Sequence, residues 1–196
     1  LQYNYQDRLI INMGYSYHYN SIGGAIINNT IASNSYSIRF NFESAGNIMY
    51  ALSKATNIRK NSDGEYAILG IPYAQYVKGE FDFSKNIRID RRNSFAFHIG
   101  MGIAVPYGNA KTIPFEKQYF SGGANSVRGW TVRDLGPGSF VGNKNTNLLD
   151  QSGDIKLDAS IEYRSKLFWK FQGAIFVDAG NIWTIRDYDN QPGGVF

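Results

Sequence analysis

The side chains that could carry chemistry in this sequence are scattered carboxylates, two histidines and one arginine set among glycines. Glu162 and Asp178 lie on two successive candidate strands, and paired carboxylates are the arrangement that glycosidases use for acid–base catalysis. His18 and His98 are isolated, and the chain has no Cys, so neither a thiolate metal site nor an HxxxH zinc motif is present. The GPGS segment at 136–139 lacks the GK[ST] ending of a phosphate-binding loop. We therefore expect no enzymatic activity, no bound cofactor and no metal, and we interpret the carboxylates as ion-pair partners.

The arginine stands in the most unusual segment, FEKQYFSGGANSVRGWTVRDLGPGSF, residues 115–140. This segment belongs to a long loop, 106–153, and loops of that length in compact domains are usually functional or disordered. Arg128 lies between Val127 and Gly129, and nearby glycines permit close backbone approaches. We therefore expect Arg128 to be directed at a specific partner.

The composition limits the class of protein that must position these residues. The chain has 196 residues, 43% of them hydrophobic and 15% aromatic, which is enough apolar material for a folded body. Its 14 Tyr, 13 Phe and 21 Gly favour an all-β protein. The net charge is +4, but Lys and Arg are mixed with Asp and Glu, so we expect no nucleic-acid partner. No segment approaches the ~20 apolar residues of a membrane-spanning helix.

Alternation of apolar and polar residues predicts six long strands. In the strand predicted after residue 93, Phe95, Phe97 and Ile99 alternate with Ala96, His98 and Gly100. The same split into an apolar and a polar face recurs in all six predicted strands: 8–20, 34–45, 72–84, 94–105, 154–164 and 173–183. AGNIMYALSKATN, residues 45–57, predicts a short helix in the first long loop.

Three features favour a membrane β-barrel over a soluble sandwich, which also alternates. The strands are longer than the usual ~5–6 residues and match the ~9–11 that cross a bilayer. Aromatic residues such as Tyr15, Tyr17 and Tyr19 gather near strand ends, as in an interfacial girdle. The polar face is rich in Gly, Ser and Asn, which suits a water-filled lumen.

A membrane sheet must close, because lipid cannot satisfy an unpaired strand edge. Six strands are too few, since bacterial single-chain barrels begin at about eight. Residues 1–196 are therefore expected to be one fragment of a barrel, with the remaining strands outside this chain. The short turns at 86–93 and 166–171 are predicted on the periplasmic side, and the long loops at 46–71 and 106–153 outside.

Three ordered motifs resemble the outer-membrane assembly superfamily that includes BamA, TamA and the bacterial surface antigen proteins. They are SGGANSVRGW at 121–130, SIEY at 160–163 and FVDAGNIW at 176–183. The resemblance covers the C-terminal barrel portion. It implies an antiparallel transmembrane barrel of about 16 strands, within the even-numbered bacterial series, with the long loop folded into the lumen.

The resemblance also implies roles for individual residues. In that family the arginine of the VRG tip meets acidic residues on the next two strands. Carried over, Arg128 is the tip cation, Glu162 and Asp178 are its partners, and Phe176 packs beside it. Trp130 stands where the family usually has Phe or Tyr. The other residues expected at the loop tip or in its packing are Val127, Gly129 and Gly180, with loop glycines Gly122 and Gly123.

The strand pattern agrees with this on one point. Alternation alone places Glu162 and Asp178 on the polar face of two consecutive strands. Gly100, Gly102 and Ala104 leave the same face of the preceding strand almost bare, which makes room for an inserted loop.

The function implied by the resemblance is assembly and insertion of other proteins in the outer membrane. The expected partners are outer-membrane lipid, nascent outer-membrane proteins as substrates, and periplasmic or lipoprotein accessory subunits. Periplasmic repeats are expected before this chain, and a substrate strand is expected to pair at a barrel seam whose strands lie outside it. One alternative is a two-partner-type secretion pore of the same superfamily, and another is a plain structural or porin barrel. BamA-like, TamA-like and lipid-handling roles are not separated by these motifs.

Overall fold

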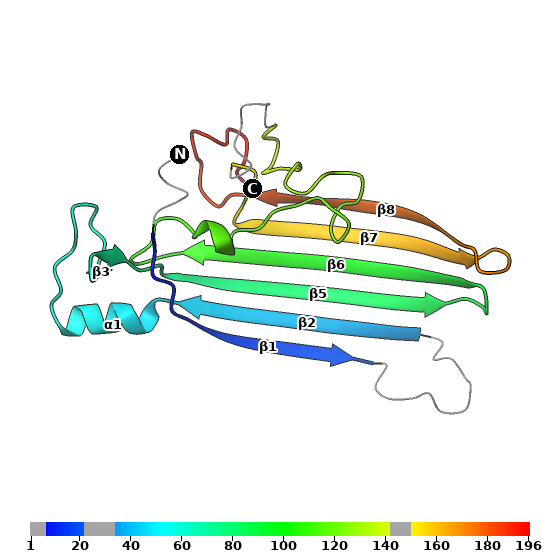
Figure 1. The fold of residues 1–196 in the computed structure, drawn as a ribbon, viewed down its shortest axis with the longest axis horizontal. Coiled ribbons are helices and arrows are strands. Elements are labelled where there is room, and N and C mark those ends of the chain that lie inside the picture. Colours follow the sequence, from blue (N-terminus) through cyan, green and yellow to red (C-terminus); the bar gives the residue numbers. More distant parts are fainter. Residues whose placement is uncertain (1–6, 22–33, 142–149) are drawn as a thin grey trace.

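The structure, a computed structural model, describes residues 7–21, 34–141 and 150–196. Its main element is a six-stranded antiparallel sheet with strand order β1-β2-β5-β6-β7-β8 (Figure 1). The strands are β1 (Asn12–Asn20), β2 (Asn34–Ala45), β5 (Tyr76–Arg88), β6 (Asn93–Pro106), β7 (Ile155–Lys166) and β8 (Gln172–Trp183). The predicted all-β antiparallel class is therefore confirmed.

The register keeps the two faces of the sheet chemically separate. Glu80 pairs with Gly102, which pairs with Lys156, whereas the next row joins Phe81, Met101 and Leu157. Residues that pair directly across strands share a face, so one face is mainly polar and the other mainly apolar. The apolar face is strongly exposed, as at Met13 (67%), Ile175 (75%) and Val177 (71%). Soluble proteins rarely expose an apolar surface this continuous, and a transmembrane barrel presents it to lipid.

Two predicted strand boundaries were wrong. The strand predicted at 8–20 begins at Asn12, because Leu9 forms an isolated parallel bridge with Tyr73 instead. The strand predicted at 72–84 runs from Tyr76 to Arg88, so the turn predicted at 86–93 shortens to 89–92. The polar residues between 85 and 88 hid the continuing strand, because charged side chains near the membrane–water interface break the apolar alternation.

The long connections from β2 to β5 and from β6 to β7 leave the sheet at one end, and the short turns from β5 to β6 and from β7 to β8 lie at the other (Figure 1). Between β2 and β5 lie α1 (Asn47–Ala55), close to the predicted helix, and a small hairpin of β3 (Ala67–Ile68) and β4 (Ile71–Pro72). The long loop predicted at 106–153 follows β6 and contains a short 3₁₀ helix, Phe115–Lys117. Residues 142–149 of that loop lie outside the described residues.

Buried residues concentrate at the end that carries the loops. A cluster of buried apolar residues joins the loops to the polar face of the sheet and consists of Ala45, Ala74, Tyr76, Ala104, Ile113, Tyr119 and Ile182. No helix within the described ranges is long and apolar enough to span a membrane.

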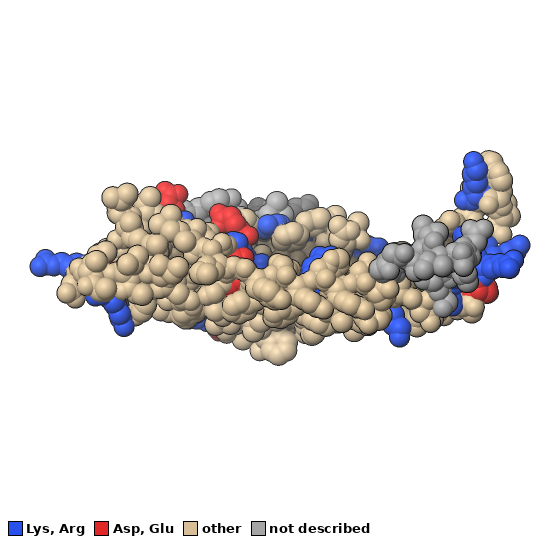
Figure 2. All heavy atoms as spheres, turned by 90° about the horizontal axis from the view of Figure 1, so that it is seen from below, with Lys and Arg blue, Asp and Glu red and all other residues tan. Residues whose placement is uncertain are grey.

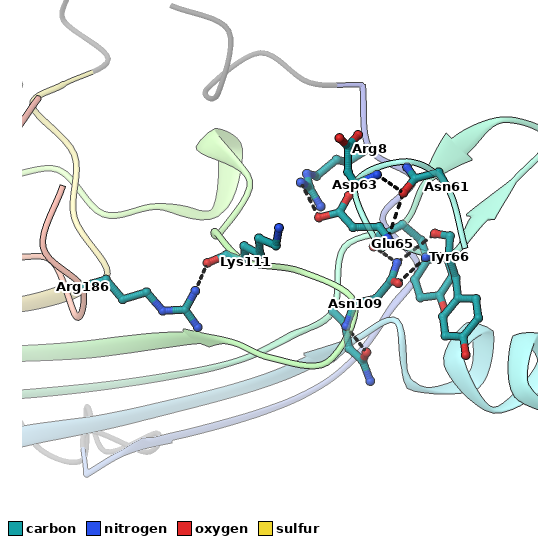
Figure 3. Close-up of polar contacts among 10 residues, drawn as sticks. Arg8, Asn61, Asp63, Glu65, Tyr66, Asn109, Lys111 and Arg186 are labelled. Atoms are coloured by element: carbon teal, nitrogen blue, oxygen red, sulfur yellow. Dashed lines mark hydrogen bonds and ion pairs between the residues drawn. The ribbon is translucent and has the colours of Figure 1, made fainter. Parts of the chain in front are cut away.

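A polar cluster fastens the two long loops to each other (Figure 3). Asn109 donates to the carbonyl oxygens of Tyr66 (2.9 Å) and Tyr73 (3.0 Å), and its Oδ1 accepts the Tyr66 amide at 2.6 Å. In the same cluster, Arg8 and Glu65 form an ion pair at 3.2 Å with both side chains largely buried. The start of the long loop is therefore fixed before it turns toward the lumen.

Candidate functional site

The loop tip is a narrow hairpin-like fold built on glycine. Ser121 and Leu135 form an antiparallel bridge, and the Gly123 amide donates to the Trp130 carbonyl at 2.9 Å. Gly122 has φ 95°, in the region that L side chains rarely adopt, and a Cβ there would collide with the Thr131 carbonyl oxygen. This geometry brings the tip residues 124–129 to the far end of the hairpin.

The hairpin delivers Arg128 to Asp178 on β8. The Arg128 Nε donates to Asp178 Oδ2 at 2.7 Å and its Nη2 donates to Oδ1 at 2.7 Å, which is a bidentate contact. The backbone amide of Arg128 also donates to Asp178 Oδ2, at 3.0 Å. One carboxylate therefore fixes both the side chain and the main chain of the tip.

The third side of the guanidinium faces β7. Arg128 Nη1 donates to Glu162 Oε2, and the other Glu162 oxygen accepts from Arg164 Nε at 2.5 Å. Arg128 Cζ lies 3.7 Å from the ring centroid of Phe176, so the guanidinium stacks on an aromatic face. The structure thus brings together four of the predicted site residues from the loop, β7 and β8.

Burial makes these contacts strong. The Asp178 side chain is 2% exposed, Glu162 13% and Arg128 26%. The hydrogen bonds to Asp178, and then those to Glu162, raise the pKa of the Arg128 guanidinium above its ordinary value. The arginine is permanently charged and its carboxylate partners are engaged, so the arrangement is suited to holding the loop in place. We call Arg128, Glu162 and Asp178 the tip anchor.

The other residues predicted at the loop tip differ in their exposure and in the space around them. Val127 is buried at 5% exposure, and Trp130 is half exposed and contributes its carbonyl to the hairpin. Gly129 has φ 94° and open space around its missing side chain. A Cβ at Gly180 would lie 2.9 Å from Asp158 Cβ, so this glycine makes room for the neighbouring strand.

Sequence reasoning missed a second attachment of the same loop. Lys117 Nζ lies 2.7 Å from Glu43 Oε1 on β2, and Lys78 Nζ on β5 donates to the Lys117 carbonyl at 3.1 Å. Tyr119 donates from its hydroxyl to the Gly79 carbonyl at 3.2 Å, and Lys78 Nζ lies 4.3 Å from its ring centroid. We call the set Lys117, Tyr119, Glu43 and Lys78 the stem anchor.

Tyr119 occupies a space that the sequence had indicated. A Cβ at Gly102 would lie 2.6 Å from Tyr119 Cζ, so the bare strand does accommodate the loop there. Burial, followed by the charge of Glu80, raises the pKa of the Tyr119 hydroxyl, which stays neutral and able to donate. Over Gly100 the expectation was wrong, because Asp158 of β7 fills the space at 2.9 Å from a Cβ at that position.

The histidine on the same polar face lies between carboxylates. His98 Nε2 is 3.4 Å from Asp82 Oδ1, and its Nδ1 is 3.5 Å from Asp158 Oδ2. Lys156 Nζ also approaches Asp158, at 3.3 Å. Within the part of the chain that the structure describes, no group of three His, Cys, Asp or Glu residues is arranged to hold a metal ion.

The chain is similar to known proteins across nearly its whole length. The model of a protein family described as the Omp85 superfamily domain matches residues 4–195. The outer membrane protein assembly factor BamA of Neisseria meningitidis serogroup B (strain ATCC BAA-335 / MC58) is 34% identical over 101 residues, covering 46% of this chain and 12% of that protein. The crystal structure of BamA from Haemophilus ducreyi lacking POTRA domains 1–3 aligns with 90% of this chain and 42% of that chain, with TM-score 0.46 and 16% identity. The chain thus spans well under two thirds of the length of either relative.

Proposed function

Because the chain belongs to the Omp85 superfamily and forms part of an outer-membrane β-barrel, we propose that the full-length protein inserts other proteins into the outer membrane. Its substrates are nascent outer-membrane proteins, and periplasmic or lipoprotein subunits assist it. The activity is non-enzymatic and uses no bound cofactor. The observation that carries this proposal is the luminal loop held to the barrel wall by the tip anchor.

The two anchors give the loop a mechanical role in this activity. The stem anchor ties the loop to β2 and β5, and the tip anchor ties it to β7 and β8. The loop itself follows β6, which lies between these two pairs of strands. It therefore braces the wall from the inside and fixes the curvature of the sheet. A fixed wall lets a barrel open elsewhere and offer a strand edge to a substrate, which is β-augmentation within a membrane.

The proposal is tested with Arg128→Ala in the full-length protein. We expect less heat-resistant barrel on semi-denaturing gels and slower insertion of a model outer-membrane protein into liposomes. Removal of the cation leaves Asp178 and Glu162 without their main partner, at a cost of roughly 3 kcal/mol. Wild-type behaviour in both assays would refute the proposed role. A protein that exported a single secreted partner would instead show large single-channel conductance and no insertion activity.

A further inference from the structure

The turn between β7 and β8 exposes four large apolar side chains in a row broken by one lysine. Leu167 is 55% exposed, Phe168 70%, Trp169 84% and Phe171 55%. Tight turns normally use Gly, Asn, Asp, Pro or Ser, because those residues supply the required backbone shapes. Here Trp169 adopts φ 50°, which is uncommon outside glycine, and the turn closes through the Leu167 amide and the Phe171 carbonyl at 3.0 Å.

These aromatic rings contact one another within the turn. The ring centroids of Phe168 and Phe171 are 5.2 Å apart, and those of Trp169 and Phe171 are 6.1 Å apart. The fold gains little from such contacts at a turn that projects away from the sheet (Figure 1). A cluster of this size in water is unfavourable, so its environment must be at least partly apolar.

The neighbouring turn is basic. The Lys166 amide donates to the Arg92 carbonyl at 2.9 Å, which holds the two turns together. The cations of the two turns are Arg88, Arg91, Arg92, Lys166 and Lys170. None of them forms an ion pair with a carboxylate among residues 7–21, 34–141 and 150–196. Figure 2 shows Lys and Arg gathered at the end of the molecule that carries these turns, with one acidic patch beside them.

The one carboxylate in these turns, Asp90, forms hydrogen bonds within its own turn. Asp90 accepts hydrogen bonds from the amides of Arg92 (2.6 Å) and Asn93 (2.9 Å), and from the Asn93 side chain at 2.8 Å. The Arg88 guanidinium bonds to the carbonyl oxygens of Asp90 and Arg91 at 2.9 and 3.3 Å. The turn is thus closed by Asp90 and Arg88, while the exposed side chains of Arg91 and Arg92 remain available for an anionic ligand.

We propose that residues 88–92 and 166–171, the periplasmic rim, bind the headgroups of anionic phospholipids in the periplasmic leaflet while their aromatic side chains enter the headgroup region. Short turns of bacterial barrels face the periplasm, and the inference rests on the outer-membrane location of the chain rather than on its proposed activity. Aromatic rings favour this depth of a bilayer, and exposed Lys and Arg bind lipid phosphate. The rim also continues the exposed apolar face of β8, on which Ile175 and Val177 lie. Charge and apolar continuity together favour lipid over a protein partner.

The experiment measures quenching of Trp169 fluorescence by brominated lipids in the full-length protein. The protein is reconstituted in phosphatidylcholine vesicles with a minor fraction of either brominated phosphatidylglycerol or brominated phosphatidylcholine. The Trp169 signal is the difference between the wild type and Trp169→Phe. We expect stronger quenching by the anionic lipid, and we expect this preference to vanish in high salt, where the Debye length falls to about 3 Å.

Variants that remove the same number of charges at the rim and elsewhere distinguish lipid binding at the rim from an effect of the protein's net charge. Arg91→Gln with Arg92→Gln should reduce the preference for phosphatidylglycerol by about fivefold per cation, up to about thirtyfold together. Arg59→Gln with Lys111→Gln removes the same charge from exposed positions in the long loops and should leave the preference unchanged. Equal quenching by the two lipids would overturn the proposal. Quenching of Trp169 by neither lipid, as expected if a protein covers the turn, would also overturn it. Loss of the lipid preference with normal insertion activity in the Arg91 and Arg92 variant would support lipid binding by the rim without bearing on the proposed insertion function.

Discussion

Replacing Arg128 by lysine tests whether the shape of the guanidinium, and not only its charge, holds the loop. Arg128 makes three side-chain hydrogen bonds to two carboxylates and stacks on Phe176 at 3.7 Å. Lysine keeps the charge but has a single nitrogen, which cannot bind both oxygens of Asp178 and reach Glu162 at the same time. The planar stack on Phe176 is also lost.

The expected cost of Arg128→Lys follows from these contacts. Hydrogen bonds to charged partners contribute about 1.5–3 kcal/mol each, but those of one arginine are not additive. Two of the three bonds are lost, so we expect about 2 kcal/mol for lysine and roughly 3 kcal/mol for alanine. A change of 2 kcal/mol shifts the balance between the seated and unseated loop by about thirtyfold.

The assay is urea unfolding of the full-length protein in lipid vesicles, combined with a double-mutant cycle. Arg128→Ala and Asp178→Asn should each destabilise, and the double variant should be no worse than the worse single variant. Arg164→Ala is the matched control, because Arg164 binds the same Glu162 but its side chain is 54% exposed, so its loss should cost less than about 1 kcal/mol. Wild-type stability for Arg128→Lys, or additive effects in the cycle, would refute a direct bidentate anchor.

Three further outcomes are expected from the same structure. Gly102→Leu should displace Tyr119 and make the bond after Lys117 more accessible to trypsin. Gly79→Leu, which has open space for the side chain, should leave this cleavage unchanged. Equal rates of cleavage after Lys117 in the two variants would contradict the stem anchor. Gly122→Ala and Gly129→Ala both place alanine at positive φ at a cost of roughly 1–3 kcal/mol, but only Gly122→Ala also meets a backbone oxygen, so its unfolding midpoint should fall further. Burial raises the pKa of Asp154, so the protonated form is favoured on folding; this stabilisation is complete below the unfolded-state value of about 3.9 and is lost as the pH rises through the folded-state pKa. Asp154→Asn should therefore flatten the pH dependence of the melting temperature, and an unchanged pH profile would disprove the assignment.

The sequence was sufficient for the class of fold because its signal is local. Alternating residues such as Phe95, Phe97 and Ile99 each report the face on which they lie, and the register preserves that alternation across the sheet. The short helix in the first long loop was predicted for the same local reason. The family resemblance is confirmed by the match over residues 4–195.

The tip anchor was reachable only through the resemblance. Alternation placed Glu162 and Asp178 on one face, but nothing local says that Arg128 from a loop would lie between them. The structure brings the three together, while their role in assembly stays a prediction.

The stem anchor and the strand ends depend on contacts distant in sequence. Glu43 on β2 and Lys117 are separated in sequence by α1 and by the four strands β3 to β6, and their pairing follows from the register and the loop path together. The end of β5 was missed because Lys85 and Arg88 are tolerated near the membrane interface, where the apolar pattern no longer applies. The apolar–polar alternation of a strand is weakest at the membrane–water interface, where the environment changes from lipid to water.

The loop that follows β6 is attached to the strands on both sides of β6, so it spans the polar face of the sheet. Bending the sheet about β6 would change the distance between the stem anchor on β2 and β5 and the tip anchor on β7 and β8. Such bending would have to stretch the ionic contacts of these attachments. For the insertion activity proposed above, we therefore expect the barrel to deform at strands outside this six-stranded segment.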